Sequence, residues 1–210
     1  MTLLVAKGTR VGRGTAPRLL VEAAHELFST QGYRATTTQQ IAAKAGVTES
    51  LIFRYFNSKA DLFVASVLKP FVKVLDETAA RWSDAAVLTD EQQIRDYVSG
   101  LVECLADHRQ ATLALFEVVA SRDSGPDTAV IRDAFVRLFE RITPSTAAFV
   151  TDPRHRRMDP DLAARMGFLI ISAVSALLPS TYRRADDAPS RDRIVEELTQ
   201  FFLHGVRPPG

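Results

Sequence analysis

Cysteine, tryptophan and long apolar runs are scarce in this 210-residue sequence. The single cysteine, Cys104, excludes an internal disulfide, and no CxxC or clustered His/Cys spacing indicates a structural zinc site. A chain without disulfides suits a reducing compartment. The first 18 residues lack an apolar run followed by a small-residue cleavage site, so no secretory signal is expected. We therefore expect a cytoplasmic protein.

Signatures of a membrane span and of common catalytic sites are also missing. The longest uncharged apolar run, 166–178, falls short of the roughly 20 residues that span a bilayer. It is interpreted as a buried helix, and no membrane association is expected. The sequence has no GxSxG, HExxH or P-loop and no plausibly spaced carboxylate pair. No catalytic residue, metal site or cofactor is assigned, and an α-helical enzyme is kept as an alternative.

The charge that is present is unevenly distributed. The net charge is only +1, yet residues 1–62 carry eight Lys and Arg side chains against four Asp and Glu, a balance of +4. The rest of the chain therefore carries −3. A basic head on a mildly acidic body suits a protein whose head binds phosphates. With 46% hydrophobic and 24% charged residues, the chain has the composition of an ordinary globular protein of one or two domains.

Helical periodicity runs along nearly the whole chain, and no segment alternates convincingly as a strand would. The predicted fold class is therefore all-α, with about nine helices. Pro17 and Gly32 mark the ends of the first helix, and Gly46 ends a short second one. In chain order we expect helices at 17–30, 39–45, 49–56, 59–82 with a bend at Pro70, 90–107, 108–122, 126–150 with a kink at Pro144, 160–183 and 190–205.

The second and third helices are short and are joined by a turn that contains Gly46. Ile41, Ile52 and Phe56 fall on faces that can meet in one core. This is the helix-turn-helix arrangement, in which the second helix of the pair can enter a DNA major groove. Lys59 lies in the first turn of the next helix, where a cation is unfavourable to the helix dipole, so its presence indicates an external anion.

The stretch TTQQIAAKAGVT at 37–48 is followed by FRYF at 53–56 and NSKADL at 57–62. This segment resembles the DNA-binding domain of the TetR (tetracycline-repressor) family of bacterial transcriptional regulators, over about 45 to 50 residues once the first helix is included. The resemblance implies a DNA-binding domain at 1–62 and a helical effector-binding and dimerisation domain at 63–210. It also implies a homodimeric repressor that binds a near-palindromic double-stranded DNA operator and is released by a small, largely apolar effector. An architectural DNA-binding protein without an effector is the alternative.

The resemblance further implies which side chains face DNA. Those at the start of the third helix approach base edges, while Arg54, Tyr55 and Lys59 approach phosphates or, for Arg54, a guanine. Of the threonines at 37 and 38, either can act as a helix cap, and the resemblance places one of them against a phosphate. The residues assigned to the DNA interface are Thr37, Thr38, Thr48, Glu49, Ser50, Leu51, Phe53, Arg54, Tyr55 and Lys59.

Three positions depart from the usual family pattern. Glu49 stands where a cation is common, Leu51 where a threonine is common, and Phe53 where a tyrosine is common. Leu51 can contact a thymine methyl, and Glu49 can accept a hydrogen bond from a cytosine amino group. The bases that are read are therefore left open. The basic arm, with Lys7, Arg10 and Arg13, either contacts phosphates or a minor groove or is a solubilising tail.

The last two predicted helices carry the broadest apolar faces. Residues 166–178 are apolar nearly all round, which is typical of a helix that packs on its own domain and on a neighbour. Two such helices from each subunit would form a four-helix interface, and the alternative is that both close a monomer core. The predicted interface residues are Met166, Ile170, Ala173, Leu177, Ile194, Leu198, Phe201 and Phe202.

The central helices are expected to enclose an effector pocket, although ordinary core packing is the alternative for each candidate residue. Cys104 and His108 have the i, i+4 spacing of metal ligands, but the sequence shows no third ligand nearby. The candidate lining residues are Trp82, Tyr97, Leu101, Cys104, Leu105, Phe116, Phe139 and Phe168.

Overall fold

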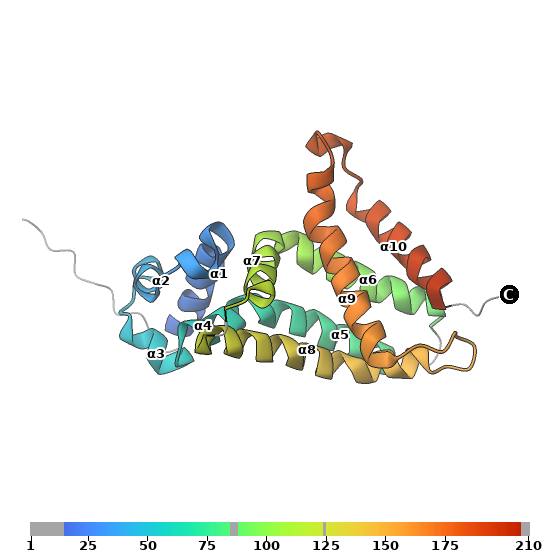
Figure 1. Ribbon diagram of the computed structural model, residues 1–210, viewed down its shortest axis with the longest axis horizontal. Helices are drawn as coiled ribbons and strands as arrows, with labels where there is room; N and C mark the ends of the chain where they lie inside the picture. Colours follow the sequence, from blue (N-terminus) through green and yellow to red (C-terminus); the bar gives the residue numbers. More distant parts are fainter. Residues whose placement is uncertain (1–14, 85–87, 124, 207–210) are drawn as a thin grey trace, which may run out of the picture.

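The computed structural model describes residues 15–84, 88–123 and 125–206 (Figure 1). Lys7, Arg10 and Arg13 of the basic N-terminal segment lie outside this part of the chain. Its regular secondary structure is entirely helical over the described residues, which confirms the all-α fold class. The α-helices are α1 (Ala16–Ala35), α2 (Thr38–Ala45), α3 (Ser50–Phe56), α4 (Lys59–Phe63), α5 (Lys69–Asp84), α6 (Asp90–Asp107), α7 (Arg109–Ala120), α8 (Pro126–Val150), α9 (Pro160–Leu177) and α10 (Arg191–Val206).

A π-helical turn, Val64–Leu68, joins α4 to α5, and the residues on either side of it keep right-handed helical backbone angles. Helix α4, this π turn and α5 therefore form one continuous rod, so the described residues contain the nine helical segments that were predicted. A π turn lies directly before Pro70, where the sequence predicted a bend, and the bend itself stays a prediction. The rod crosses the boundary drawn at residues 62 and 63 without a break, and the division into two domains stays a prediction.

Helices α1, α2 and α3 form a head at one end of the molecule (Figure 1). Leu20 from α1, Ile41 from α2 and Ile52 from α3 are fully buried and belong to one continuous core. Burial of a side chain of this size contributes about 1.5–3 kcal/mol. Within α1 the backbone leaves helical geometry at Gly32, where φ is 79°, a conformation that favours glycine. The chain therefore turns towards α2 at the residue where the sequence predicted the end of the first helix.

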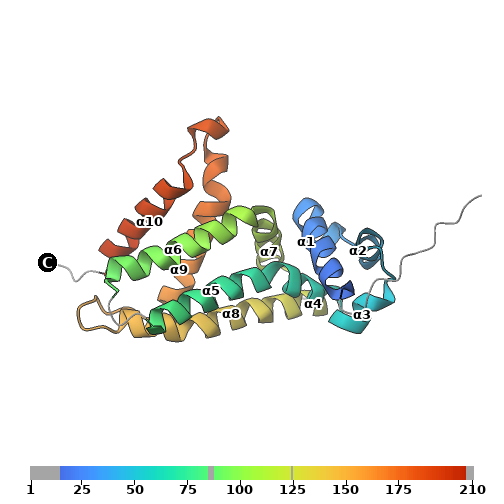
Figure 2. The same cartoon turned by 180° about the vertical axis from the view of Figure 1, so that it is seen from behind.

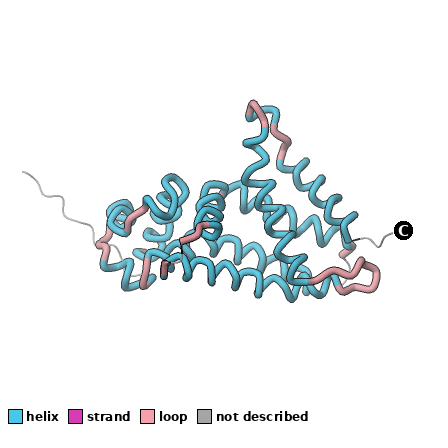
Figure 3. The backbone as a smooth tube through the Cα atoms, viewed as in Figure 1, coloured by secondary structure: helices cyan, strands magenta, loops and turns pink. Residues whose placement is uncertain are grey.

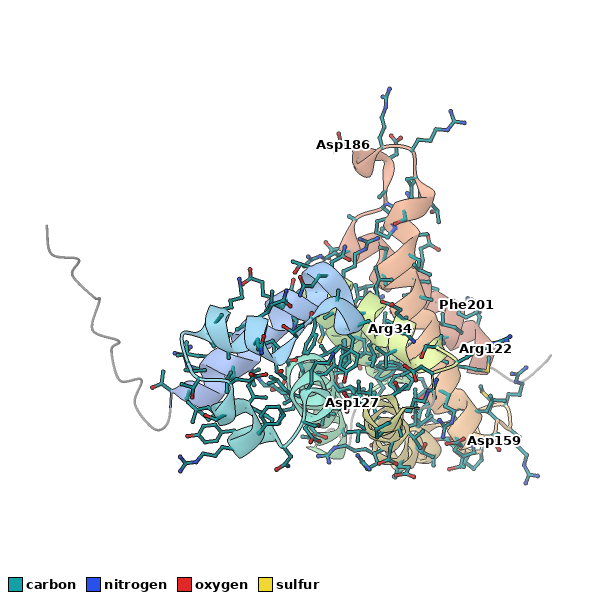
Figure 4. The ribbon with its side chains drawn as sticks, turned by 60° about the vertical axis from the view of Figure 1, so that its left-hand side comes forward. Arg34, Arg122, Asp127, Asp159, Asp186 and Phe201 are labelled. Atoms are coloured by element: carbon teal, nitrogen blue, oxygen red, sulfur yellow. The ribbon has the colours of Figure 1, made fainter. Side chains whose placement is uncertain are left out.

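The body continues from the head along the long axis of the molecule. Helices α5, α6 and α8 run along this axis, and α7 lies next to the head (Figures 1 and 2). Helices α9 and α10 rise from these helices as an arm and are joined near Asp186 by two 3-10 turns, Leu178–Thr181 and Ala185–Asp187 (Figure 4). In the arm α9 packs on α8 and α6, while α10 packs on α6. A loop at 151–159 joins α8 to α9 (Figure 3).

Four phenylalanine rings fasten α9 to the helices beneath it. Phe71 from α5, Phe135 and Phe139 from α8, and Phe168 from α9 form edge-to-face pairs with ring centroids 5.1–6.1 Å apart. Such pairs contribute about 0.5–1.5 kcal/mol beyond the burial of the rings. The cluster therefore fixes α9 against both α5 and α8.

His25 on α1 connects the head to the body. Its Nδ1 lies 3.0 Å from the carbonyl oxygen of Ser66 in the π turn, and its Nε2 lies 3.2 Å from Nδ1 of His108. Pro70 has no N–H and cannot donate to the Ser66 carbonyl as a residue at i+4 normally does, and His25 supplies a donor in its place. Because a carbonyl only accepts, His25 carries its proton on Nδ1, and neutral His108 donates to Nε2 of His25.

This contact makes the stability of the protein depend on pH. Burial lowers the pKa of His108, the neighbouring His25 lowers it further, and Asp107 acts in the opposite direction. The folded protein therefore binds this proton less readily than the unfolded chain. His108 stabilises the fold above the ordinary histidine pKa of about 6.5, and this contribution is lost as the pH falls towards the lowered pKa. We expect the free energy of unfolding, measured with urea, to contain a component that decreases between about pH 7 and pH 5.

The variant His108→Gln keeps a polar side chain but does not titrate, so it should lack this component when compared with the parent protein. The exposed His204 on α10 offers a matched control. His204→Gln should leave unchanged the difference between the free energies of unfolding at about pH 7 and about pH 5. A pH dependence of stability that is the same in His108→Gln and in the parent would contradict the assignment.

Candidate nucleic-acid interface and body cavity

Helix α2 begins at a threonine cap and ends at a glycine in the left-handed conformation. The Thr37 hydroxyl accepts from the N–H of Gln40 at 3.2 Å, and the Gln40 side chain accepts from the N–H of Thr37 at 2.9 Å, which completes a capping box. Gly46 has φ 66°, and its N–H reaches the carbonyls of Ala42 and Ala43. These two ends set a tight turn between α2 and α3.

Helix α3 has an inner and an outer side. Ile52 is fully buried, and Leu51 and Tyr55 are half-buried against the head core. Phe53, with 51% of its surface exposed, and Arg54 face outward. The outer side of α3 therefore presents a guanidinium and an aromatic ring, whereas Leu51 is available only in part.

Hydrogen bonds organise the start of α3. The hydroxyls of Thr48 and Ser50, both on exposed residues, lie 3.0 Å apart. The Thr38 hydroxyl donates to Oε1 of Glu49 at 2.5 Å, which holds this carboxylate against α2. Thr37 is thus the capping threonine and Thr38 the one that contacts α3. Glu49 retains a second oxygen that can accept from a base, and its contact with DNA stays a prediction.

Lys59 lies against the end of α1. Its Nζ donates to the carbonyl oxygens of Tyr33 at 3.2 Å and Thr36 at 3.0 Å, and lies 4.2 Å from the centroid of the Tyr33 ring. Burial lowers the pKa of Lys59, and Asp127 acts in the opposite direction. The protein itself therefore supplies negative partners, and the position of Lys59 does not by itself require an external anion. A phosphate contact by Lys59 stays a prediction.

A cavity of about 630 Å³ lies in the body, between α5, α6, α8, α9 and α10. This volume is within the range of small-molecule sites, about 300–1,000 Å³. Small residues leave the space open, among them Ala79 on α5 and Ala163, Ala164 and Gly167 on α9. The lining also includes exposed side chains such as Phe201, which is labelled in Figure 4, so the cavity is open to solvent on one side.

Among the predicted pocket residues, Tyr97 lines this cavity. Phe116 is half-buried on α7, and the side chain of Trp82 lies outside the described part of the structure. The other predicted pocket residues are buried in the core; they are Leu101, Cys104, Leu105, Phe139 and Phe168. Sequence reasoning selected large side chains, whereas the cavity forms where side chains are small. The small residues at 163, 164 and 167 are the signal that would have located it.

The predicted i, i+4 pair of Cys104 and His108 is not part of a metal site in the described residues, where no group of three or more His, Cys, Asp or Glu side chains is placed to hold a metal ion. Cys104 is buried, and this burial, with a smaller effect from Asp107, raises the pKa of its thiol to about 11. The thiol is therefore a packing group and a poor nucleophile.

Helix α9 has two apolar faces. The inner face packs on the body through residues such as Phe168 and Ile171, which are buried. The opposite face is exposed, and we call it the α9 stripe because its residues recur at helical spacing along one side. The α9 stripe consists of Leu162, Met166, Leu169 and Leu177, each with 43–55% of its surface exposed. Of the predicted interface residues on α9, Met166 and Leu177 belong to it, and Ile170 and Ala173 are partly exposed.

Helix α10 is rotated differently from the prediction. Phe201 is 61% exposed and lines the mouth of the cavity, but Leu198 is buried in the protomer. Ile194 and Phe202 are half-buried against the same core. Three of the four apolar side chains predicted to face a partner from α10 therefore pack, wholly or in part, within their own body.

The segment Pro160–Thr181 is long and apolar enough to cross a membrane, judged by length and composition alone, and 33% of its apolar window is buried. This segment is longer than the apolar run that the sequence indicated. Because it contains α9, whose two faces are both apolar, its composition is explained by a helix that packs on one side and is exposed on the other.

Known proteins resemble the head and the whole chain. A family model described as bacterial regulatory proteins, tetR family, matches residues 20–66, which include α2 and α3. The transcriptional repressor DhaR of Mycobacterium sp. (strain GP1) is 29% identical over 188 residues, which cover 87% of this chain and 88% of DhaR. The protein is a TetR-family transcriptional regulator. The TetR-family chain is also 27% identical to the regulator RutR of Escherichia coli (strain K12) over 207 residues, 91% of this chain and 90% of RutR.

Solved structures share the fold of this TetR-family protein. The fatty acid degradation regulator FadR of Bacillus halodurans matches with a TM-score of 0.70 at 19% identity, over 96% of this chain and all of that one. A regulator from Saccharomonospora viridis in complex with choline matches with a TM-score of 0.63 at 21% identity, over 94% of this chain and all of that one. The names of these proteins are those of regulators and point away from an enzyme. The TetR-family chain binds DNA through its helix-turn-helix head.

Proposed function

We propose that this TetR-family protein is a homodimeric repressor whose two heads bind a near-palindromic operator and leave it when a small molecule occupies the body cavity. The observation that carries the proposal is the presence, in one chain, of an outward-facing α3 and an exposed apolar α9 stripe. The similarity to DhaR, which is named a repressor, supports repression over activation. The choline complex of the structural neighbour from Saccharomonospora viridis supports a small ligand. A DNA-binding regulator of this kind acts in the cytoplasm.

The α9 stripe and Phe201 are the proposed contact surface between subunits. Large apolar side chains gather here, since five of the eight exposed large apolar residues noted over the described chain lie on α9 and α10. Burial of such side chains favours association. A two-fold contact would present the two α3 helices to successive major grooves about 34 Å apart, or somewhat further.

The proposed DNA contacts follow from exposure. Thr48 and Ser50 approach base edges with their hydroxyls, and Arg54 addresses a guanine or a phosphate, because all three lie on the outward side of the head. Glu49, held by Thr38, is proposed to accept from a cytosine amino group. Leu51 contributes only the part of its side chain that the head core leaves free.

Helix α8 is the proposed connection between ligand and head. Near its start, Asp127 accepts a hydrogen bond from the Tyr33 hydroxyl at 2.8 Å, and burial together with this bond raises the pKa of Tyr33. Arg34 of the head pairs with Asp123 directly before α8, and Figure 4 labels Arg34 and Asp127 in this region. Near its other end, residues such as Phe149 line the cavity. A ligand shifts the heads only if it binds the released arrangement more tightly than the DNA-bound one.

The proposal is tested by selecting duplex fragments of the source genome with the purified full chain. We expect recovery of near-palindromic sites, and a logarithm of affinity that falls linearly with the logarithm of salt concentration, with a slope of about −0.9 per phosphate neutralised. Salt-dependent binding without any preferred sequence would favour an architectural protein. If no duplex is retained at low salt, the protein is not a regulator of this kind.

A further inference from the structure

The lining of the cavity carries an uneven charge. Asp76 is the only carboxylate among the described lining residues, and its two oxygens accept from Arg141 at 2.5 and 2.8 Å. Arg156 also lines the cavity and is exposed, and it makes no ion pair with any other described residue. One guanidinium is therefore left without an anion at the edge of an apolar space. Its planar set of N–H donors matches the geometry of a carboxylate.

The two residues that precede Arg156 hold its loop in place through contacts with α6 and α8. Nδ1 of His155 lies 2.8 Å from the carbonyl oxygen of Phe149, and its Nε2 lies 2.9 Å from a carboxylate oxygen of Asp90. Arg154 pairs with the same Asp90 at 3.3 Å. Burial acts to lower the pKa of His155, but Asp90 and the carbonyl of Phe149 raise it overall, so the ring favours the charged form, whose Nδ1 donates to Phe149 and whose charge pairs with Asp90. A positioned loop reduces the entropy lost when Arg156 binds an anion.

We propose that the ligand of this cavity is an amphipathic monocarboxylate, whose apolar body fills the space between α5, α8 and α9 and whose carboxylate pairs with Arg156; this rests on the proposed effector function. The apolar walls, with residues such as Leu75, Ile142 and Ile170, favour an aliphatic body. Two hydroxyls of the lining are already engaged, because Thr146 donates to the carbonyl of Ile142 and Thr78 accepts from Arg81. A cationic ligand would meet the unpaired guanidinium as a like charge.

Three probes with unbranched alkyl chains of about nine or ten carbons test the charge of the ligand: sodium decanoate, decan-1-ol and decyltrimethylammonium, each below its micelle-forming concentration. Isothermal titration calorimetry with the full-length protein measures their affinities. We expect decanoate to bind about tenfold or more tightly than the other two, because a hydrogen bond to a charged group contributes about 1.5–3 kcal/mol. Equal or tighter binding of decyltrimethylammonium overturns the proposal.

Two arginine variants separate the site from general surface charge. Arg156→Gln should weaken decanoate binding about tenfold or more and leave decan-1-ol binding unchanged. Arg157→Gln is the matched control, because Arg157 is the exposed neighbour that does not line the cavity. Unchanged decanoate affinity in Arg156→Gln, or equal losses in both variants, overturns the assignment of Arg156.

A third variant, Gly167→Leu, tests whether the ligand binds in the cavity. A Cβ at Gly167 would meet its nearest neighbour, Cε1 of Tyr97, at an ordinary 3.8 Å, so a longer side chain is expected to extend into the cavity and exclude all three probes. Full decanoate binding by this variant overturns the location. Retention of a selected operator fragment, with and without decanoate, separates the two proposals. Saturable, Arg156-dependent binding that leaves the DNA complex intact supports the ligand class and contradicts the effector function, whereas operator binding without decanoate binding contradicts the ligand class alone.

Discussion

Replacing both Leu169 and Leu177 with glutamate is expected to convert the proposed dimer into monomers and to weaken operator binding by about a hundredfold or more. Both side chains belong to the α9 stripe, with 43% and 49% of their surfaces exposed, and neither lines the cavity. A two-fold contact would bring four carboxylates into an apolar interface, where an unpaired charge is strongly unfavourable. Loss of the second head removes the gain of roughly 10² to 10⁴ that two linked binding sites provide.

Size-exclusion chromatography with light scattering measures the mass, and fluorescence anisotropy with a selected operator measures the affinity. Val136→Glu on α8 is the matched control, because Val136 is 44% exposed but does not belong to the α9 stripe and should leave the dimer intact. A double variant that remains dimeric would exclude the α9 stripe as the contact surface. Leu198→Glu is unsuitable for this test, since Leu198 is buried and a charge there destabilises the protomer itself.

The substitution Arg54→Ala is expected to abolish specific recognition while the dimer stays folded. Arg54 is exposed on α3 and makes no hydrogen bond to another described residue. Its guanidinium lies 5.9 Å from the centroid of the Tyr55 ring, a weak contact on the surface, so its removal is expected to leave the head folded. A bidentate contact with guanine discriminates by about 1–3 kcal/mol, and a dimer loses two of them, which predicts a loss of roughly 2–6 kcal/mol. Anisotropy with operator and scrambled duplexes at one salt concentration measures the change.

Lys44 provides the comparison for Arg54, because it is a cation of the same head but pairs with Glu26 at 2.6 Å. Lys44→Ala should weaken binding to operator and scrambled duplexes alike, if at all, and keep their ratio. If Arg54→Ala instead lowers both affinities by the same factor, Arg54 contacts a phosphate and the guanine assignment is excluded. No change in either affinity would remove Arg54 from the interface.

The head was predictable because its signals are local in sequence. Gly32 and Gly46 adopt positive φ angles where α1 kinks and where α2 ends, and Thr37 caps α2 through a residue only three positions away. The contacts of Lys59 could not be predicted from the residues next to it in the sequence. Its partners, the carbonyls of Tyr33 and Thr36, lie 26 and 23 residues earlier, and nothing in the sequence around Lys59 indicates that the end of α1 comes within reach.

The body was predictable in its helices but not in how they face one another. Leu198 and Phe201 both belong to the apolar pattern of α10, yet one is buried and the other is 61% exposed, because the rotation of α10 is set by its packing on α6. The cavity has the same origin, since Ala79 and Gly167 leave space only because α5 and α9 bring them together. Periodicity identifies an apolar face and does not identify its partner.

Because α8 is long, a small rotation at one of its ends produces a large displacement at the other. Its 25 residues span roughly 37 Å at 1.5 Å per residue, with the cavity near one end and the bond from Tyr33 to Asp127 near the other. A rotation of about 5° around the cavity end displaces the opposite end by roughly 3 Å over that length. Such a displacement is about the length of a hydrogen bond. A small movement of α8 at the ligand would therefore be enough to form or break the hydrogen bond between Tyr33 of the head and Asp127.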